Sequence, residues 1–181
     1  EGMYNYAKMK DEGDGIPINK EESLQYYKMA ADKGHIDSMA KYGLILKNGD
    51  GIKSNKEKSS KYLKKAAEKG NIDAMNAYGM MLKHGDGVPV NIEQSLFYLK
   101  SSAEKEHVEA MNNYADMLKN GTGVAINNEE ACKYYKMSAE KGNVDAMNNY
   151  GDMLKNGSQS KSSRCTLQLW IDDRRRPFCF T

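Results

Sequence analysis

The amino-acid sequence predicts an all-α protein, a solenoid of antiparallel helical hairpins, because two residue sets recur every 36 residues and each repeat carries two helical patterns. The first set is Tyr6, Tyr42, Tyr78, Tyr114 and Tyr150, and the second is Met3, Met39, Met75, Met111 and Met147. No gap interrupts the period, so all repeats have the same length. Such a period is typical of stacked supersecondary units, in which neighbouring repeats supply the core that one repeat cannot form alone.

Each repeat is expected to contain two amphipathic helices. In residues 73–84, Ala74, Tyr78 and Leu82 fall on one side of a helical wheel, and in residues 92–105 Leu99 and Ala103 do the same. Moving these patterns by 36 residues predicts first helices near residues 2–12, 37–48, 73–84, 109–120 and 145–156. It predicts second helices near residues 20–33, 56–69, 92–105 and 128–141.

A glycine-containing triplet separates the two helices of a repeat. The triplets are Gly13-Asp14-Gly15, Gly49-Asp50-Gly51, Gly85-Asp86-Gly87 and Gly121-Thr122-Gly123. Glycine adopts the positive φ that ends a helix, so we expect these loops to terminate the first helix and turn the chain. A phosphate-binding loop would instead follow a strand and open a helix with Lys and Ser or Thr.

No set of residues points to catalysis, a metal or a cofactor. Of the three histidines, only His35 and His107 share a repeat position, and Cys132 is a single cysteine that we expect to pack inside the array. Adjacent acids such as Glu21 and Glu22 begin second helices, where negative charge is favourable. The chain is therefore not expected to be an enzyme.

Charge divides the chain into two predicted regions. Residues 1–157 hold 22 Lys, no Arg and 23 acidic residues, whereas residues 158–181 hold one Lys, all four Arg and two Asp. We predict a repeat array at 1–157, about four and a half repeats truncated at both ends, and an unrelated basic tail at 158–181. The tail has three open interpretations: a frameshift or fusion sequence, a disordered linker, or a basic site for acidic partners.

The same numbers limit the classes of partner. A nearly neutral array gives no electrostatic reason to expect nucleic acid, and no apolar run approaches the roughly 18 residues of a membrane helix. The chain begins at Glu1 without an initiator Met or a visible signal peptide. We therefore expect it to be part of a longer chain, with no membrane insertion.

A family resemblance rests on the order of motifs between residues 74 and 103. These motifs are Ala74, Tyr78-Gly79, Gly85-Asp86-Gly87-Val88, Asn91, Tyr98-Leu99 and Ser102-Ala103. The order resembles the Sel-1-like repeat, a relative of the tetratricopeptide repeat, over residues 1–157. The resemblance implies a right-handed α-solenoid of antiparallel helical hairpins. Ala7 and Ala115 stand in place of a family glycine, as does Glu106, and we interpret these departures as repeat drift.

The resemblance also implies a function. Proteins of this kind are adaptors or scaffolds that bind a protein or peptide on the concave face of the array. The alternative is a regulatory repeat region of a larger signalling protein, for example beside a kinase domain. A β-lactamase-like enzyme is less expected, because no Ser-x-x-Lys nucleophile stands in a supporting sequence context. Some relatives staple each hairpin with a disulfide, but no repeat here holds two cysteines, which favours a reducing, cytoplasmic location.

The hypothetical binding surface is the side of the first helices opposite their apolar face. Its residues are Ala40, Leu44, Lys47, Asn76, Met80, Lys83, Asn112, Asp116, Lys119, Asn148, Asp152 and Lys155. Leu44 and Met80 either anchor a peptide or pack against neighbouring first helices. The lysine row and the two aspartates would set the direction of the partner by charge.

Overall fold

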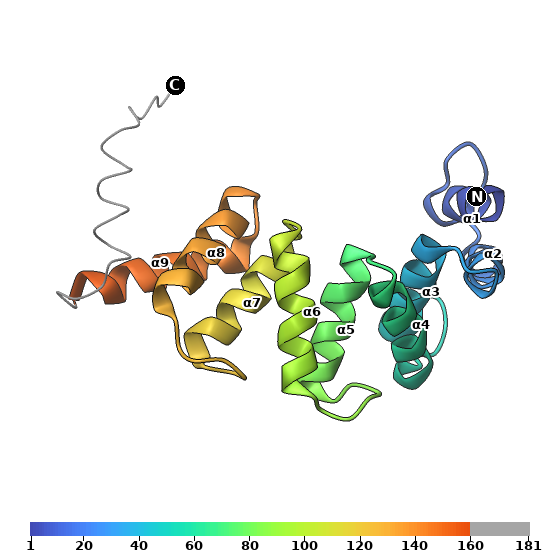
Figure 1. Ribbon diagram of the computed structural model, residues 1–181. Helices are drawn as coiled ribbons and strands as arrows, with labels where there is room; N and C mark the ends of the chain where they lie inside the picture. Colours follow the sequence, from blue (N-terminus) through green and yellow to red (C-terminus); the bar gives the residue numbers. More distant parts are fainter. Residues whose placement is uncertain (160–181) are drawn as a thin grey trace, which may run out of the picture. The chain divides into compact units, whose positions relative to one another are not determined.

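The structure, a computed structural model, describes residues 1–159, with side chains through Lys155. This part of the chain forms nine α-helices and no strand, drawn in sequence colours in Figure 1. The first helices of the hairpins are α1 (Gly2–Glu12), α3 (Ile36–Asn48), α5 (Ile72–His84), α7 (Val108–Asn120) and α9 (Val144–Gln159). The second helices are α2 (Lys20–Asp32), α4 (Lys56–Glu68), α6 (Ile92–Glu104) and α8 (Asn128–Glu140). The predicted all-α fold is confirmed.

Two compact units make up the chain. The first, Glu1–His107, contains α1 to α6, and the second begins at Val108 and contains α7 to α9. In the first unit each helix packs against the next in sequence, and α3 also contacts α5. In the second unit α8 packs against both α7 and α9. Helix α9 includes Ser158 and Gln159, which the sequence assigned to the tail, and the remaining tail residues lie outside the described part.

Glycine ends α1, α3 and α5, as the triplets predict, whereas α9 continues through Gly157 to Gln159. Gly13, Gly49 and Gly85 have φ of 79°, 83° and 76°, in the left-handed region that side chains disfavour. The backbone N–H of each glycine donates to a carbonyl in the last turn of its helix. These loops are therefore helix C-caps.

An asparagine begins each of the four second helices. Its side-chain oxygen accepts a hydrogen bond from the backbone N–H three residues later, over 2.9–3.0 Å, at Asn19, Asn55, Asn91 and Asn127. The backbone N–H of the same asparagine donates to the last turn of the first helix, at the carbonyls of Lys10, Leu46, Leu82 and Leu118. One residue thus starts the second helix and closes the hairpin.

The interface between the two helices of a hairpin repeats along the chain. A first-helix tyrosine meets a second-helix tyrosine edge to face, with ring centroids 4.6–5.3 Å apart, in the pairs Tyr6–Tyr26, Tyr42–Tyr62, Tyr78–Tyr98 and Tyr114–Tyr134. In the first two hairpins a buried serine hydroxyl also donates to a first-helix carbonyl, Ser23 to Ala7 and Ser59 to Gly43.

Polar links join consecutive hairpins of the first unit. The Tyr62 hydroxyl donates to Asp32 over 2.6 Å, and the Asn71 amide donates to Asp37 over 3.0 Å. One buried cluster runs from Ala31 through Leu63 to Leu82, so it includes residues from three hairpins. This shared core is what holds the first helices α3 and α5 next to each other.

Candidate functional site

The predicted binding surface begins with an apolar pair on α3 and α5. Leu44 and Met80 occupy the same repeat position, and both are only partly exposed. Leu44 packs against the buried cluster that contains Met75 and Leu82. Leu44 therefore contributes to the core and also offers part of its side chain to solvent.

The four lysines of the predicted surface differ in their exposure. Lys47, Lys83 and Lys119 are partly exposed, whereas Lys155 on α9 is exposed. The Lys119 ammonium lies 5.9 Å from the centre of the Tyr135 ring. Lys47 adds to the effect of Lys56, whose hydrogen bond is the main cause of the lowered pKa of Asp86.

Other members of the predicted set take part in packing. Ala40 is 3% exposed and Asn112 is 9% exposed, contrary to the exposed face that the helical wheel predicts for them. Asn112 accepts a hydrogen bond from Asn149 on α9 over 3.1 Å, which links two first helices of the second unit. Asp116 accepts from the Tyr135 hydroxyl over 2.5 Å. Asn148 and Asp152 are exposed, and Asn76 is partly exposed.

The structure brings the predicted residues together in two separate groups. In the first unit α3, with Ala40, Leu44 and Lys47, is in contact with α5, with Asn76, Met80 and Lys83. In the second unit the hydrogen bond between Asn112 and Asn149 joins α7 to α9. Each unit therefore carries its own part of the first-helix face.

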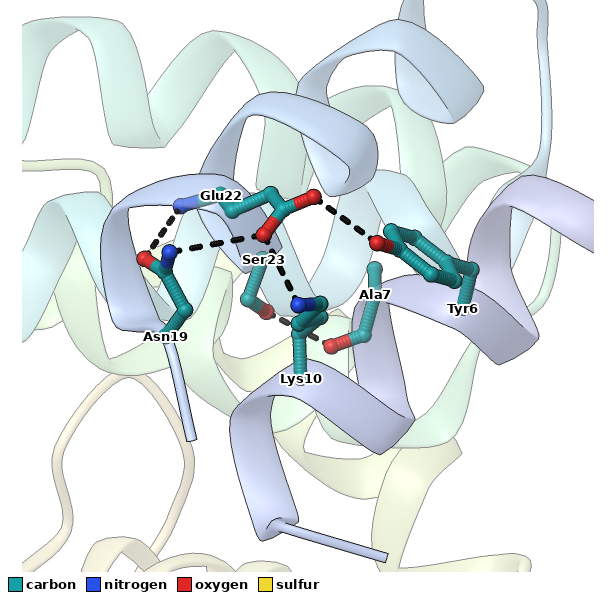
Figure 2. A network of polar contacts seen from close by, with 6 residues as sticks. All are labelled: Tyr6, Ala7, Lys10, Asn19, Glu22 and Ser23. Carbon is teal, nitrogen blue, oxygen red and sulfur yellow. Dashed lines mark hydrogen bonds and ion pairs between the residues drawn. The ribbon is translucent and has the colours of Figure 1, made fainter. Parts of the chain in front are cut away.

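A polar network in the first hairpin is the strongest candidate for acid–base chemistry, and Figure 2 shows it from close by. Glu22 accepts from the Tyr6 hydroxyl over 2.8 Å, and its other oxygen lies 3.0 Å from the Lys10 ammonium. The backbone N–H of Glu22 is in turn capped by Asn19. The network thus ties the first helix to the start of the second.

The electrostatics of this network do not favour catalysis near neutral pH. The hydrogen bond with Glu22 raises the pKa of Tyr6 and also that of Lys10. The hydrogen bonds from Lys10 and then Tyr6 lower the pKa of Glu22. All three groups move away from the neutral range in which a general acid or base works best. We interpret the network as helix capping, as the sequence predicted for the acids at this position.

The histidines also have local roles. His35 caps α3, because its Nδ1 accepts from the backbone N–H of Ser38 over 3.2 Å. His107 lies 3.1 Å from the Asp73 carboxylate, at the position where Asn71 binds Asp37 one repeat earlier. Among residues 1–159, no group of three or more His, Cys, Asp or Glu side chains is placed to hold a metal. No helix in that range is long and apolar enough to cross a membrane.

Sequence reasoning missed one surface. Met147 and Gly151 are exposed on α9, whereas their equivalents in the second to fourth repeats are buried, and Val144 is more exposed than the partly buried Ile36, Ile72 and Val108. The sequence places these residues two periods after Ile72, Met75 and Gly79. Their exposure is visible only in the structure, where no described residue covers them.

Comparison with known proteins places the fold in a family. The model of the Sel1 repeat matches residues 1–35, 36–71, 72–107, 108–143 and 144–163. A search of curated proteins gave no match.

Two solved structures are similar at moderate sequence identity. One is c5321, a protective antigen of uropathogenic Escherichia coli strains displaying an SLR fold; it is 27% identical, with a TM-score of 0.76 over 94% of this chain and 38% of the antigen. The other is a Sel1 repeat protein from Oxalobacter formigenes, 29% identical, with a TM-score of 0.72 over 83% of this chain and 62% of that one. This chain therefore spans less than two thirds of either protein.

A third structure agrees at the level of the fold alone. Cysteine rich protein B from Helicobacter pylori is 20% identical, with a TM-score of 0.55 over 71% of this chain and 92% of that one. The hairpin geometry, the 36-residue period and the five matched repeats lead to one conclusion: the chain belongs to the Sel1 repeat family.

Proposed function

We propose that this repeat array is a protein-interaction scaffold and that the first-helix face of its first unit binds a peptide or protein. Sel1 repeat proteins are generally protein–protein interaction scaffolds, which supports this class of function. Fold alone does not identify a site, so the face must be argued from its residues.

The observation that carries the proposal is the partly exposed apolar pair on α3 and α5. Leu44 and Met80 lie at the same repeat position on two helices in contact, and Lys47 and Lys83 follow each of them by three residues. Residues three apart on a helix are neighbours on its surface. An apolar anchor beside two cations fits a peptide that carries a large apolar side chain and carboxylates.

A peptide-display library selected on the whole chain tests this proposal. Peptides enriched on the wild-type protein are remeasured on a Lys47→Glu/Lys83→Glu variant and on a Lys61→Glu/Lys65→Glu control, whose lysines are exposed on α4. We expect the first variant to lose at least about tenfold in affinity, or about 1.4 kcal/mol, and the control to bind normally.

Two results would contradict the proposal. Equal losses in both variants would mean that the peptides respond to net charge, and no loss in either would mean that they bind elsewhere. A Leu44→Ser/Met80→Ser variant then tests the apolar anchor, with circular dichroism reporting whether the core packing of Leu44 has been disturbed.

A further inference from the structure

The second repeat, residues 36–71, differs in charge from the repeats on either side of it. It holds 9 Lys and 4 acidic residues, which gives a net charge of +5 with His neutral. Residues 1–35 hold 5 Lys and 7 acidic residues, and residues 72–107 hold 3 Lys and 5, so each of these repeats has a net charge of −2. All three repeats belong to the first unit. The nearly neutral array therefore includes one basic repeat between two acidic ones.

Five of the nine lysines lie on the solvent side of α4. They are Lys58, Lys61, Lys64, Lys65 and Lys69, which we call the α4 lysine face; all are exposed except Lys58, which is partly exposed. Their spacing of three and four residues places them on one side of the helix, opposite the buried Leu63. Glu57 and Glu68 are the acids on the same side, so this side of α4 has a net charge of +3.

Lys61 and Lys65 distinguish this face from the other second helices. Their positions are occupied by Gln25 and Met29 in α2, by Phe97 and Ser101 in α6, and by Lys133 and Met137 in α8. The ammonium of Lys133 lies 3.5 Å from Glu129, whereas neither Lys61 nor Lys65 forms an ion pair with a described residue. Lysines four residues apart on a helix repel each other. Helix α4 thus carries an unneutralised pair of cations at the centre of its exposed side.

Acidic side chains of the neighbouring repeats lie beside α4, but they bind other groups. Asp32 at the end of α2 accepts a hydrogen bond from the Tyr62 hydroxyl over 2.6 Å. Asp86 in the loop of the third repeat lies 2.6 Å from the Lys56 ammonium. Negative charge of both neighbouring repeats therefore borders α4, whose 13 residues extend over about 20 Å.

We propose that the α4 lysine face binds an acidic peptide segment of another protein, about as long as α4 itself. The carboxylates of such a segment complement the five ammonium groups. Lysine ammonium groups act as point charges, so they hold carboxylates without the fixed fork geometry of arginine. No large apolar side chain of α4 is exposed, so this surface lacks an apolar anchor and is a different site from the first-helix face.

Larger anionic partners fit the surroundings of the face less well. A nucleic-acid duplex or an anionic bilayer extends beyond one helix and would meet the acidic repeats on either side. Single-stranded nucleic acid gains affinity from base stacking on aromatic side chains, but the one aromatic residue of α4, Tyr62, is only partly exposed. A short acidic segment is attracted by the face and avoids the repulsion of the neighbouring repeats.

The probe is a labelled peptide of alternating Glu and Ser, about as long as α4 and without the apolar side chain that the first-helix face requires. In fluorescence anisotropy at about 0.1 M salt, where distant charges are screened, it should bind the whole chain saturably. Lys61→Glu/Lys65→Glu should weaken this binding at least about tenfold. Lys133→Glu/Lys136→Glu is the matched control, because it makes the same change in net charge on the equivalent side of α8, and it should leave binding unchanged.

A milder variant keeps the test valid if charge reversal disturbs the fold. Lys61→Gln/Lys65→Gln removes the two charges without adding repulsion, so it should weaken binding by a smaller factor while circular dichroism shows unchanged helicity. Equal losses in the α4 and α8 variants, or no binding at millimolar peptide, would overturn the proposal. So would a uridine homopolymer or phosphatidylserine vesicles that bind more tightly than the peptide through Lys61 and Lys65. Each of these results leaves the first-helix proposal intact, because that proposal is tested at Lys47 and Lys83.

Discussion

The hairpins α1·α2 and α3·α4 have the same caps and hydrogen bonds but different side chains at the centre of the interface between their two helices. Both have an asparagine cap, a tyrosine pair and a buried serine that donates to a first-helix carbonyl, over 2.7 Å in one and 2.6 Å in the other. At the centre, however, the first hairpin has Ala7 and Tyr27, whereas the second has Gly43 and Leu63. Tyr27 and Leu63 are both fully buried.

The difference teaches that these two positions vary together. Hairpin α5·α6 repeats the glycine–leucine pair with Gly79 and Leu99, and α7·α8 repeats the alanine–tyrosine pair with Ala115 and Tyr135. The branched leucine leaves room for no Cβ on the facing residue. Interpreting Ala7 and Ala115 as mere drift was therefore incomplete, since each alanine occurs with its own second-helix partner.

The largest loss of stability is expected from substituting the second loop glycine of the third hairpin, because its surroundings are tighter than those of the same glycine in the second hairpin. In Gly87→Ala the new Cβ would lie 2.4 Å from the Lys56 carbonyl carbon and 2.7 Å from the Glu57 nitrogen, both backbone atoms that cannot move aside. With φ at +69° as well, we expect a loss of about 3–4 kcal/mol in the free energy of unfolding. Gly51→Ala, whose nearest atom is 3.5 Å away, should lose only about 1 kcal/mol. Similar losses in urea denaturation would contradict the close approach at Gly87.

The second test converts the Gly43–Leu63 pair into the alanine–tyrosine pair of the first hairpin. Gly43→Ala forces a Cβ against Leu63, and overpacking of about 1–3 kcal/mol exceeds the gain of about 1 kcal/mol from replacing a helical glycine. Adding Leu63→Tyr recreates the pair of the first hairpin. We expect a favourable coupling of about 1 kcal/mol in a double-mutant cycle measured by urea denaturation. Additive losses would mean that the two positions vary independently.

Most of the fold could be predicted from the sequence, and the reasons are local. The 36-residue period and the loop glycines located the predicted helices, eight of them within one residue at each end, because Asn19 and its equivalents fix where second helices start. The site was less predictable. A helical wheel treats a first helix as exposed on one side, but neighbouring repeats bury Ala40 and Asn112. Which first-helix residues stay exposed, as on α9, depends on packing that one repeat does not encode.

The two alanine–tyrosine hairpins differ in the hydrogen bonding of the tyrosine hydroxyl. The Tyr135 hydroxyl donates to Asp116, whereas the buried Tyr27 hydroxyl has no hydrogen-bond partner among the described residues. Tyr135→Phe should therefore lose about 1 kcal/mol, and Tyr27→Phe should be neutral or stabilising. Thermal unfolding of the two variants gives the comparison, and an equal loss in both would show that Tyr27 does have a partner.

A small gain in stability is expected from a substitution in the turn that follows α6. Glu106 has a φ of +62°, where the equivalent turns have Gly34, Gly70 and Gly142. Glu106→Gly should relieve the strain and stabilise the chain by about 0.5–1 kcal/mol. The matched control is Gly142→Ala, which has open space around its Cβ and should lose about 1 kcal/mol through φ alone. A destabilised Glu106→Gly protein would indicate that contacts of the glutamate outweigh its strained backbone.

The smallest expected effect is a pH dependence of stability that the first hairpin has and the second lacks. Glu22 joins Tyr6 and Lys10 in the first hairpin, whereas Lys58 at the equivalent position lies 5.6 Å from the centre of the Tyr42 ring in the second. Lys10, and next Tyr6, lower the pKa of Glu22 from its ordinary 4.5, so the folded state binds this proton less readily than the unfolded state. The stabilisation is present above pH 4.5 and is lost as the pH falls through the lowered value.

A Glu22→Gln variant should therefore have a lower melting temperature than wild type at neutral pH, and the difference should shrink as the pH falls below 4.5. Glu21→Gln, which changes an exposed acid at the same helix start, provides the control for the loss of one negative charge. Because Glu22 is partly exposed, salt should weaken the neutral-pH difference. A difference that is constant from neutral to acidic pH would mean that Glu22 stabilises the hairpin by packing and capping, and not by its charge.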